Sequence, residues 1–243
     1  MSDYTKVGTW TNVAKSGATI YAADFDAEFT ALETAISSKA DSTGVTDVSG
    51  LFSVQIFTSS GTWTKPSGIK KVIVEVQGAG SSGTDGQSSS TRACEGGAGG
   101  YVKKLIDVSS ISSATVTIGS GGAGVSGYPS NAGGDSIWSD GTNTLTGGGA
   151  GAAGTGNYYG GAGGTATGGD LNIVGQHGGG AGPRQGADSM LGLGGTMGST
   201  SGYSQDSYDP TGYGSGSAGL YAHSAGGSTK NGKGGVVIVW EYK

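Results

Sequence analysis

The chain has 243 residues, of which 54 are glycine, and a formal net charge of −5 at pH 7; only six of the glycines precede Gln77. Collagen is excluded because no Gly-X-Y period is sustained and only four residues are proline. An ordinary helical enzyme is disfavoured because a glycine destabilises a helix interior by about 1 kcal/mol. Nucleic-acid binding is excluded because basic side chains are sparse: Arg184 is the only one between Lys104 and Lys230.

The first predicted element is a short helix within residues 18–41, part of an N-terminal attachment segment over residues 1–50. Asp24 can accept hydrogen bonds from the first turn, and Gly44 ends the pattern. A helix of about 16 residues is marginal alone in water, so its apolar stripe must pack on its own domain or on copies of itself. The stripe has the 4-3-4 spacing of a coiled-coil seam, which favours copies and predicts oligomerisation. Its members are Phe25, Phe29, Leu32 and Ile36.

From residue 51 the apolar period becomes two, which predicts a small antiparallel β-sandwich over residues 51–146. We interpret Ser59–Pro66 as a loop within it. A closing strand at Val236–Tyr242 completes the sandwich. The other predicted strands are Leu51–Phe57, Lys71–Gln77, Tyr101–Val108, Ala114–Ile118 and the weaker Ser136–Trp138 and Thr144–Thr146.

The region between Thr146 and Val236 has almost no strand pattern, and a structureless loop of that length is uncommon in a compact domain. Of the eleven positions at every third residue from Gly148 to Gly178, eight are glycine. A left-handed extended helix with three residues per turn would produce this period. Such a helix bonds only to its neighbours, and close packing requires the absence of Cβ. We therefore predict that residues 147–243 form a bundle of polyglycine II rods with binding loops, followed by the closing strand.

Motifs typical of cofactor and metal sites lack the context that they need. The G-x-G-x-x-G segments at 78–83 and 119–124 follow predicted strands, but neither precedes a helix that could hold a pyrophosphate. His177 and His223 have no metal-ligating residue at a suitable spacing. We expect no cofactor, no metal and no enzymatic activity.

Cys94 is the only cysteine, so an intrachain disulfide and a zinc site built on cysteine pairs are excluded. Met1–Trp10 lacks the apolar core of a signal peptide. No apolar run approaches the roughly 20 residues of a membrane span, so we expect no membrane insertion. Low charge together with eleven tyrosines and four tryptophans predicts an ordered chain.

Aromatic and polar residues separate the glycine runs, at positions where one rod would turn into the next. The turns of a bundle gather at its end, and tyrosine combines an apolar face with a polar tip at low entropic cost. These residues therefore predict a binding surface, although each one could instead pack on its own turn. The candidates are Tyr158, Tyr159, Arg184, Tyr203, Tyr208, Tyr213, Tyr221 and His223.

Several segments, in this order, resemble the glycine-rich domain of bacteriophage tail fibres and receptor-binding proteins. They are GTWTKP at 61–66, VEVQGAG at 74–80, GGAGGY at 96–101, VTIG at 116–119 and GGVVIVW at 234–240. The resemblance covers about residues 52–243. Residues 18–41 are similar to the helical neck of trimeric phage fibres.

The glycine-rich part is similar to the distal adhesins of T-even-like phages, in which loops between polyglycine II helices contact the host outer membrane. The resemblance implies a virion protein of the tail fibre or tail tip, made in the host cytoplasm. It implies a homotrimer that attaches to other tail or baseplate proteins through its N-terminal segment. Its expected receptor is an outer-membrane protein or lipopolysaccharide. This chain departs from those adhesins by carrying its own neck. The alternatives are a structural connector or baseplate spike, and a tail-associated glycan hydrolase.

Overall fold

The structure is a computed structural model that describes residues 29–34, 50–85, 93–154, 159–180, 185–196, 208–220 and 229–243. The chain divides into two compact units, residues 1–50 and 51–243. The described residues 29–34 of the first unit are helical, and Phe29 and Leu32 are 63% and 42% exposed. Phe25 and Ile36 lie outside the described residues, so the longer helix and its oligomerising seam stay predictions.

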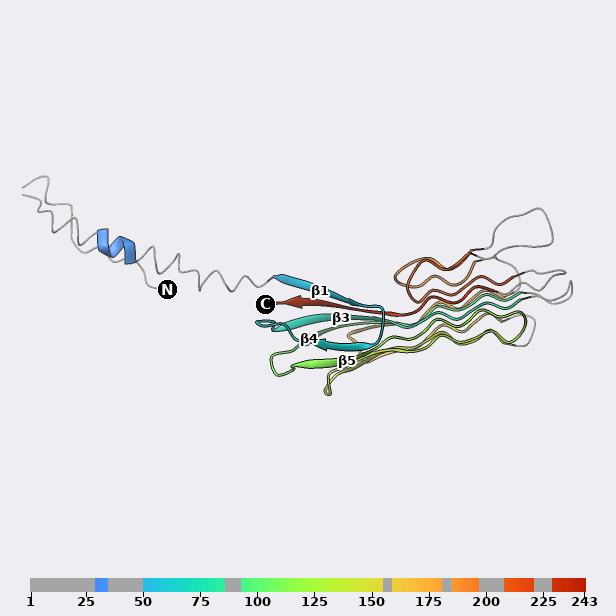
Figure 1. Ribbon diagram of the computed structural model, residues 1–243, viewed down its shortest axis with the longest axis horizontal. Coiled ribbons are helices and arrows are strands. Elements are labelled where there is room, and N and C mark those ends of the chain that lie inside the picture. Colours follow the sequence, from blue (N-terminus) through green and yellow to red (C-terminus); the bar gives the residue numbers. More distant parts are fainter. Residues whose placement is uncertain are drawn as a thin grey trace, which may run out of the picture. The chain divides into compact units, whose positions relative to one another are not determined.

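The second unit is built on a β-sandwich, which confirms the predicted mainly β fold (Figure 1). The first sheet has the strand order β1-β10-β3-β4-β9, and the second sheet has the order β2-β5-β6-β7-β8. Neighbouring strands are antiparallel in both sheets. The strands are β1 Leu51–Phe57, β2 Gly61–Thr64, β3 Lys71–Gln77, β4 Tyr101–Asp107, β5 Ser113–Thr117, β6 Ser136–Ser139, β7 Thr144–Gly147, β8 Ala166–Thr167, β9 Leu171–Ile173 and β10 Val236–Tyr242.

The hydrophobic core lies between the two sheets and is filled by alternate residues of their strands. Successive side chains of a strand point to opposite faces, so the regular valines of β3 reach the core together. Trp63 of β2 and Trp138 of β6 are fully buried, with ring centroids 5.2 Å apart. The interpretation of Ser59–Pro66 as a loop is wrong, because Gly61–Thr64 pairs with β5 and buries Trp63. Burying so large an apolar side chain contributes about 3 kcal/mol.

One carboxylate points into this core. Glu241 of β10 is fully buried. Its Oε1 accepts hydrogen bonds from Nε2 of Gln55 and Nε1 of Trp63, each at 2.7 Å, and its Oε2 accepts one from the hydroxyl of Ser53. A buried charge is costly unless its oxygens are hydrogen-bonded, and these three donors from β1 and β2 supply the bonds. Glu241 therefore ties the edge strands of both sheets to β10.

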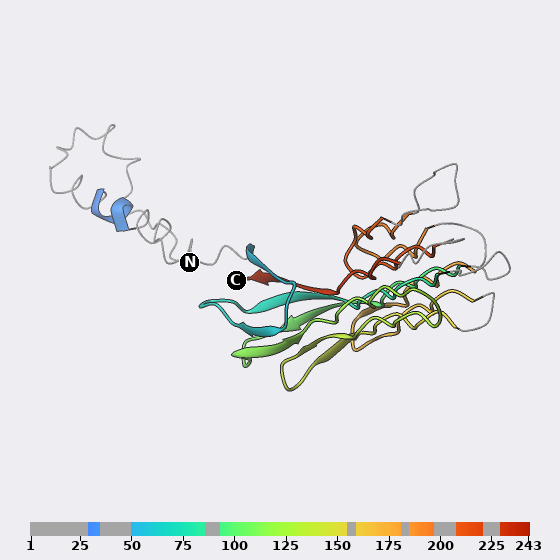
Figure 2. The ribbon, with the colours of Figure 1, turned by 45° about the vertical axis from the view of Figure 1, so that its right-hand side comes forward.

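Glycine-rich excursions leave the sandwich between β3 and β4, β5 and β6, β7 and β8, and β9 and β10. Figures 1 and 2 show them as undulating segments that continue the strands along one direction. Backbone hydrogen bonds between neighbouring rods involve segments 78–85 and 93–100 as well as residues beyond 147. Rods therefore begin directly after β3, and each outbound rod starts where a strand of the sandwich ends.

In several rows of the rods, backbone N–H groups three residues apart donate to the same neighbouring segment, which is the hydrogen-bonding pattern of polyglycine II helices. A helix with three residues per turn and no internal hydrogen bonds must bond sideways in three directions. In segment 78–85 these N···O distances are 2.8–3.3 Å. Gly78, Ser81 and Thr84 donate to carbonyls of segment 93–100. Ala79, Ser82 and Asp85 donate to the carbonyls of Gly134, Asn131 and Gly127 in that order, and Gly80 donates to the carbonyl of Lys233. Segment 93–100 repeats the pattern in two directions: Glu95 and Ala98 donate to carbonyls of residues 176–179, and Gly96 and Gly99 donate to carbonyls of residues 214–217.

Glycine is required where two rods touch. A Cβ built on Gly163 would lie 1.8 Å from the carbonyl oxygen of Gly175, and one on Gly121 would lie 1.8 Å from that of Gly232. Ordinary contact begins at 3.4 Å, so even alanine would force these backbones apart. Lateral packing of side-chain-free backbone therefore holds the rods together, as the glycine period predicts.

Candidate functional site

Two glycine-framed segments of the last excursion fold against each other. Residues 185–196 form a hairpin whose arms are joined by the Gln185–Thr196 bridge and whose tip is closed by a hydrogen bond of 2.9 Å from the Ser189 N–H to the Gly192 carbonyl. Residues 208–213 lie along its second arm. The Tyr208 N–H donates to the Thr196 carbonyl at 2.7 Å. Backbone hydrogen bonds therefore hold the hairpin and residues 208–213 together at several positions.

The hairpin and its partner segment approach each other at a pair of glycines. A Cβ on Gly212 would lie 2.4 Å from the Cα of Gly192, and a Cβ on Gly192 would lie 2.6 Å from the Cα of Gly212. The Leu191–Tyr213 bridge and the hydrogen bonds from Thr211 and Gly212 to the Leu193 carbonyl lie beside this contact. The close approach is possible only without side chains at both positions.

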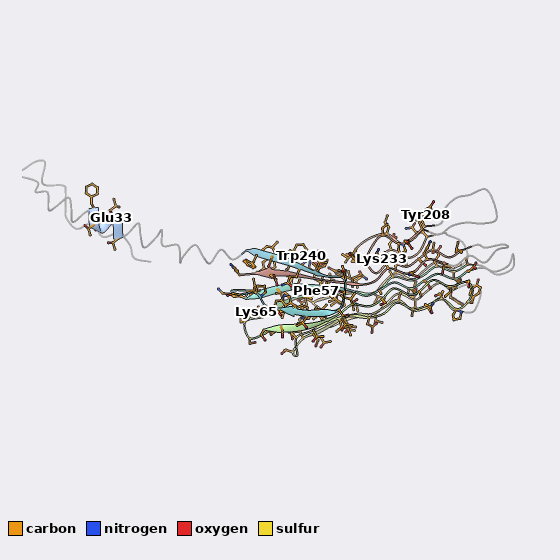
Figure 3. All side chains as sticks on the ribbon, viewed as in Figure 1. Glu33, Phe57, Lys65, Tyr208, Lys233 and Trp240 are labelled. Atoms are coloured by element: carbon orange, nitrogen blue, oxygen red, sulfur yellow. The ribbon has the colours of Figure 1, made fainter. Side chains whose placement is uncertain are left out.

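Large apolar and aromatic side chains on these two segments face solvent. They form the hairpin patch, defined as Met190, Leu193, Tyr208 and Tyr213, whose side chains are 58%, 62%, 60% and 37% exposed. Figure 3 places Tyr208 on the rods, away from Lys65 at the opposite end of the sandwich. Exposed apolar side chains gathered on a rigid backbone are typical of interaction surfaces.

The structure describes three of the eight predicted binding residues. Tyr208 and Tyr213 come together on the same paired segments. Tyr159 lies in another part of the chain, between β7 and β8, and is 77% exposed. The other five lie outside the described residues, and their roles stay predictions: Tyr158, Arg184, Tyr203, Tyr221 and His223.

Sequence reasoning missed Met190 and Leu193. The interleaving of aromatics with glycine runs indicated the tyrosines, whereas the Met-Leu-Gly-Leu stretch at 190–193 contains no aromatic residue. Three large apolar residues within four positions of a glycine-rich region are the signal that could have found them.

A buried glutamate, Glu95, accepts hydrogen bonds from the chain just before the hairpin. Glu95 is 4% exposed, and burial raises the pKa of its carboxyl to about 7. Its oxygens accept hydrogen bonds from the N–H groups of Gly179 at 2.9 Å and Gln185 at 3.1 Å. The Gly161 N–H donates to the Glu95 backbone carbonyl at 2.8 Å. Glu95 therefore fixes the chain on both sides of residues 181–184, immediately before the hairpin.

Cys94, beside it, is fully buried, and burial raises the pKa of its thiol. A protonated, buried thiol is a poor nucleophile. His177 is exposed. Among the residues that the structure describes, no group of three or more His, Cys, Asp or Glu is arranged to hold a metal ion. No helix within the described ranges is long and apolar enough to cross a membrane.

Residues 57–240 match a family described as a glycine-rich domain. The chain belongs to this family. Its glycine-rich domain extends from the last residue of β1 into β10, and so contains the second sheet, most of the first sheet, the rods and the hairpin patch. A search of curated proteins found no match to the chain.

Proposed function

We propose that the chain is a bacteriophage tail-fibre or fibre-tip adhesin that binds a bacterial surface receptor non-covalently during host attachment. The observation that carries the proposal is the hairpin patch, in which exposed Met190, Leu193, Tyr208 and Tyr213 are presented on a backbone fixed by polyglycine II rods. The resemblance to phage adhesins supplies the receptor class, an outer-membrane protein or lipopolysaccharide.

The rods favour binding because they reduce its entropic cost. An immobilised side chain or loop loses roughly 0.5–1.5 kcal/mol of freedom on binding, and a backbone that is already fixed avoids part of that loss. The Leu191–Tyr213 bridge and the Gly192–Gly212 contact hold the two segments of the patch in one register before any receptor arrives. The mechanism is recognition by a preformed surface, without a chemical step.

Assembly into a homotrimer through the N-terminal helix would multiply weak contacts. Phe29 and Leu32 are exposed in the single chain, as a coiled-coil seam would be before assembly. Several linked copies on one virion raise the apparent affinity without new contacts at any one patch. The N-terminal segment would also join the protein to other tail or baseplate proteins.

The test measures binding to whole cells. Fluorescently labelled protein is added to a panel of Gram-negative strains, and bound strains are scored by flow cytometry. Replacing Leu193 and Tyr208 by alanine is expected to weaken binding about tenfold or more, equal to at least 1.4 kcal/mol. Ile137→Ala is the matched control, because it shortens a half-buried aliphatic side chain on the outer face of β6. Melting curves check that both variants fold.

Each outcome is informative. Unchanged binding by the double variant would remove the hairpin patch as the recognition surface. Absence of binding to every strain, with no protection from infection by the parent phage, would favour a structural connector or baseplate spike. Loss of viscosity when the protein is incubated with host polysaccharide would favour the glycan hydrolase.

A further inference from the structure

The outer faces of the two sheets differ sharply in chemistry. In the second sheet Trp63, Val116, Trp138 and Leu145 point to the core, so the residues between them point outward. Most of these are small and polar, as on a sheet that faces water. They are Thr62, Thr64, Ser113, Thr115, Thr117, Ser139, Thr144 and Thr146.

The first sheet is apolar on its outer face. In register across four strands, Val54 of β1 pairs with Trp240 of β10, Trp240 with Ile73 of β3, and Ile73 with Leu105 of β4. In the adjacent row Ile56 pairs with Ile238. We call these six residues the apolar face. Val54, Ile56 and Leu105 are 39%, 61% and 54% exposed.

With strands about 4.8 Å apart, the first row alone spans roughly 14 Å. Soluble proteins rarely expose contiguous apolar surface without using it for binding.

Charged residues flank the apolar face on both sides. Glu75 continues the second row, and its Oε1 forms an ion pair of 3.0 Å with Nζ of the opposing Lys103. On the other side of the first row, Lys71 and Asp107 are register partners of opposite charge. A partner therefore meets a surface with no unpaired charge at its centre. A copy of the same surface fulfils this requirement, whereas anionic lipid or nucleic acid would need excess basic residues.

We infer that the apolar face is a subunit interface, covered in the assembled protein by the other copies of this chain. The helix of the same chain exposes Phe29 and Leu32, so both units of the single chain carry apolar surface that copies would bury. Only sixteen residues of the sequence separate Thr34 from Leu51. Helix assembly would therefore hold copies of the sheet at high effective concentration. The inference extends the proposed homotrimer and does not depend on receptor binding.

The test compares charge substitutions on the two sheets in the full chain. Ile56→Glu combined with Leu105→Glu places carboxylates at two exposed positions of the apolar face. Thr62→Glu combined with Thr117→Glu does the same on the second sheet. Light scattering over a dilution series should show assembled wild type and control. The face variant should dissociate at about tenfold higher concentration or more. Circular dichroism and melting curves verify the fold.

Cross-linking gives a second measurement that tolerates some loss of stability. Native Cys94 is fully buried, so a new surface cysteine is the reactive thiol. Leu105→Cys should give cross-linked copies with a short bismaleimide, whereas Thr117→Cys should not. A monomeric wild type, or equal assembly of the face variant and wild type, would overturn the inference. So would flotation of monomeric wild type with phosphatidylcholine vesicles that is lost in the face variant, because lipid would then cover the face.

Discussion

Replacing Gly163 by alanine tests the packing of the rods most directly. Segment 159–165 lies against segment 174–178 through two backbone hydrogen bonds. Gly175 donates to the Gly164 carbonyl at 2.9 Å, and Gly178 donates to the Gly161 carbonyl at 2.8 Å. The added Cβ would begin 1.8 Å from the Gly175 carbonyl oxygen and must reach at least 3.4 Å. A separation of that size takes both hydrogen bonds beyond a useful length.

The size of the effect follows from these contacts. Forced overpacking costs about 1–3 kcal/mol, and each lost hydrogen bond costs about 1 kcal/mol. Alanine also restricts the unfolded chain, which offsets about 0.4–1 kcal/mol. The free energy of unfolding should therefore fall by about 3 kcal/mol. For a unit of this size the melting temperature should fall by roughly 6–12 °C.

Gly154→Ala is the matched control, because a Cβ at Gly154 meets nothing within 4 Å. Urea denaturation and thermal melting by circular dichroism are measured for wild type and both variants. The control should equal wild type or exceed it by up to about 1 kcal/mol. If Gly163→Ala melts within about 1 °C of Gly154→Ala, lateral backbone packing does not hold the rods and the argument from the glycine period fails.

Three further predictions concern buried polar side chains. The native pKa of Glu95, about 7, lies above its ordinary value of 4.5. Its contribution to stability should therefore be complete below about pH 4.5 and lost as pH rises to about 7. Urea titrations across this range should show a falling free energy of unfolding in wild type and a flatter pH profile in Glu95→Gln. Glu241→Ala leaves the donors from Ser53, Gln55 and Trp63 without their acceptor and should lower the free energy of unfolding by about 3 kcal/mol, and a loss below about 1 kcal/mol in chemical denaturation would contradict this role. Because burial raises the pKa of the Cys94 thiol, a thiol-specific reagent should label it much more slowly in native than in denatured protein, and equal rates would show that the thiol is accessible.

The strands were predictable where one face of a regular sheet is uniformly apolar. The predicted bounds of Leu51–Phe57, Lys71–Gln77 and Val236–Tyr242 agree with the structure residue for residue. β2 was missed because Trp63 is its only large apolar residue, and a single residue has no period. The two short strands β8 and β9 were missed for the same lack of pattern.

The rods were predictable only where glycine recurs at every third position. In segment 78–85 serine hydroxyls take the place of backbone acceptors. Oγ of Ser81 accepts from the Gly97 N–H at 2.8 Å, and Oγ of Ser82 accepts from the Asn131 N–H at 2.9 Å. These serines keep the lateral bonding and erase the glycine period. The hairpin patch depends on long-range pairing of segments 185–196 and 208–213, which no local pattern encodes.

Because backbone groups carry the cohesion of the rods, the identity of most outward side chains contributes little to keeping the bundle together. The Gly192–Gly212 contact, for example, constrains neither Leu193 nor Tyr208 chemically. Under the proposed function, substitutions at the hairpin patch would therefore change which receptor is bound while the packing of the rods stays intact. Because stability and recognition would then depend on different residues, related proteins could adapt to a changed receptor by substituting a few exposed side chains and keeping the same fold.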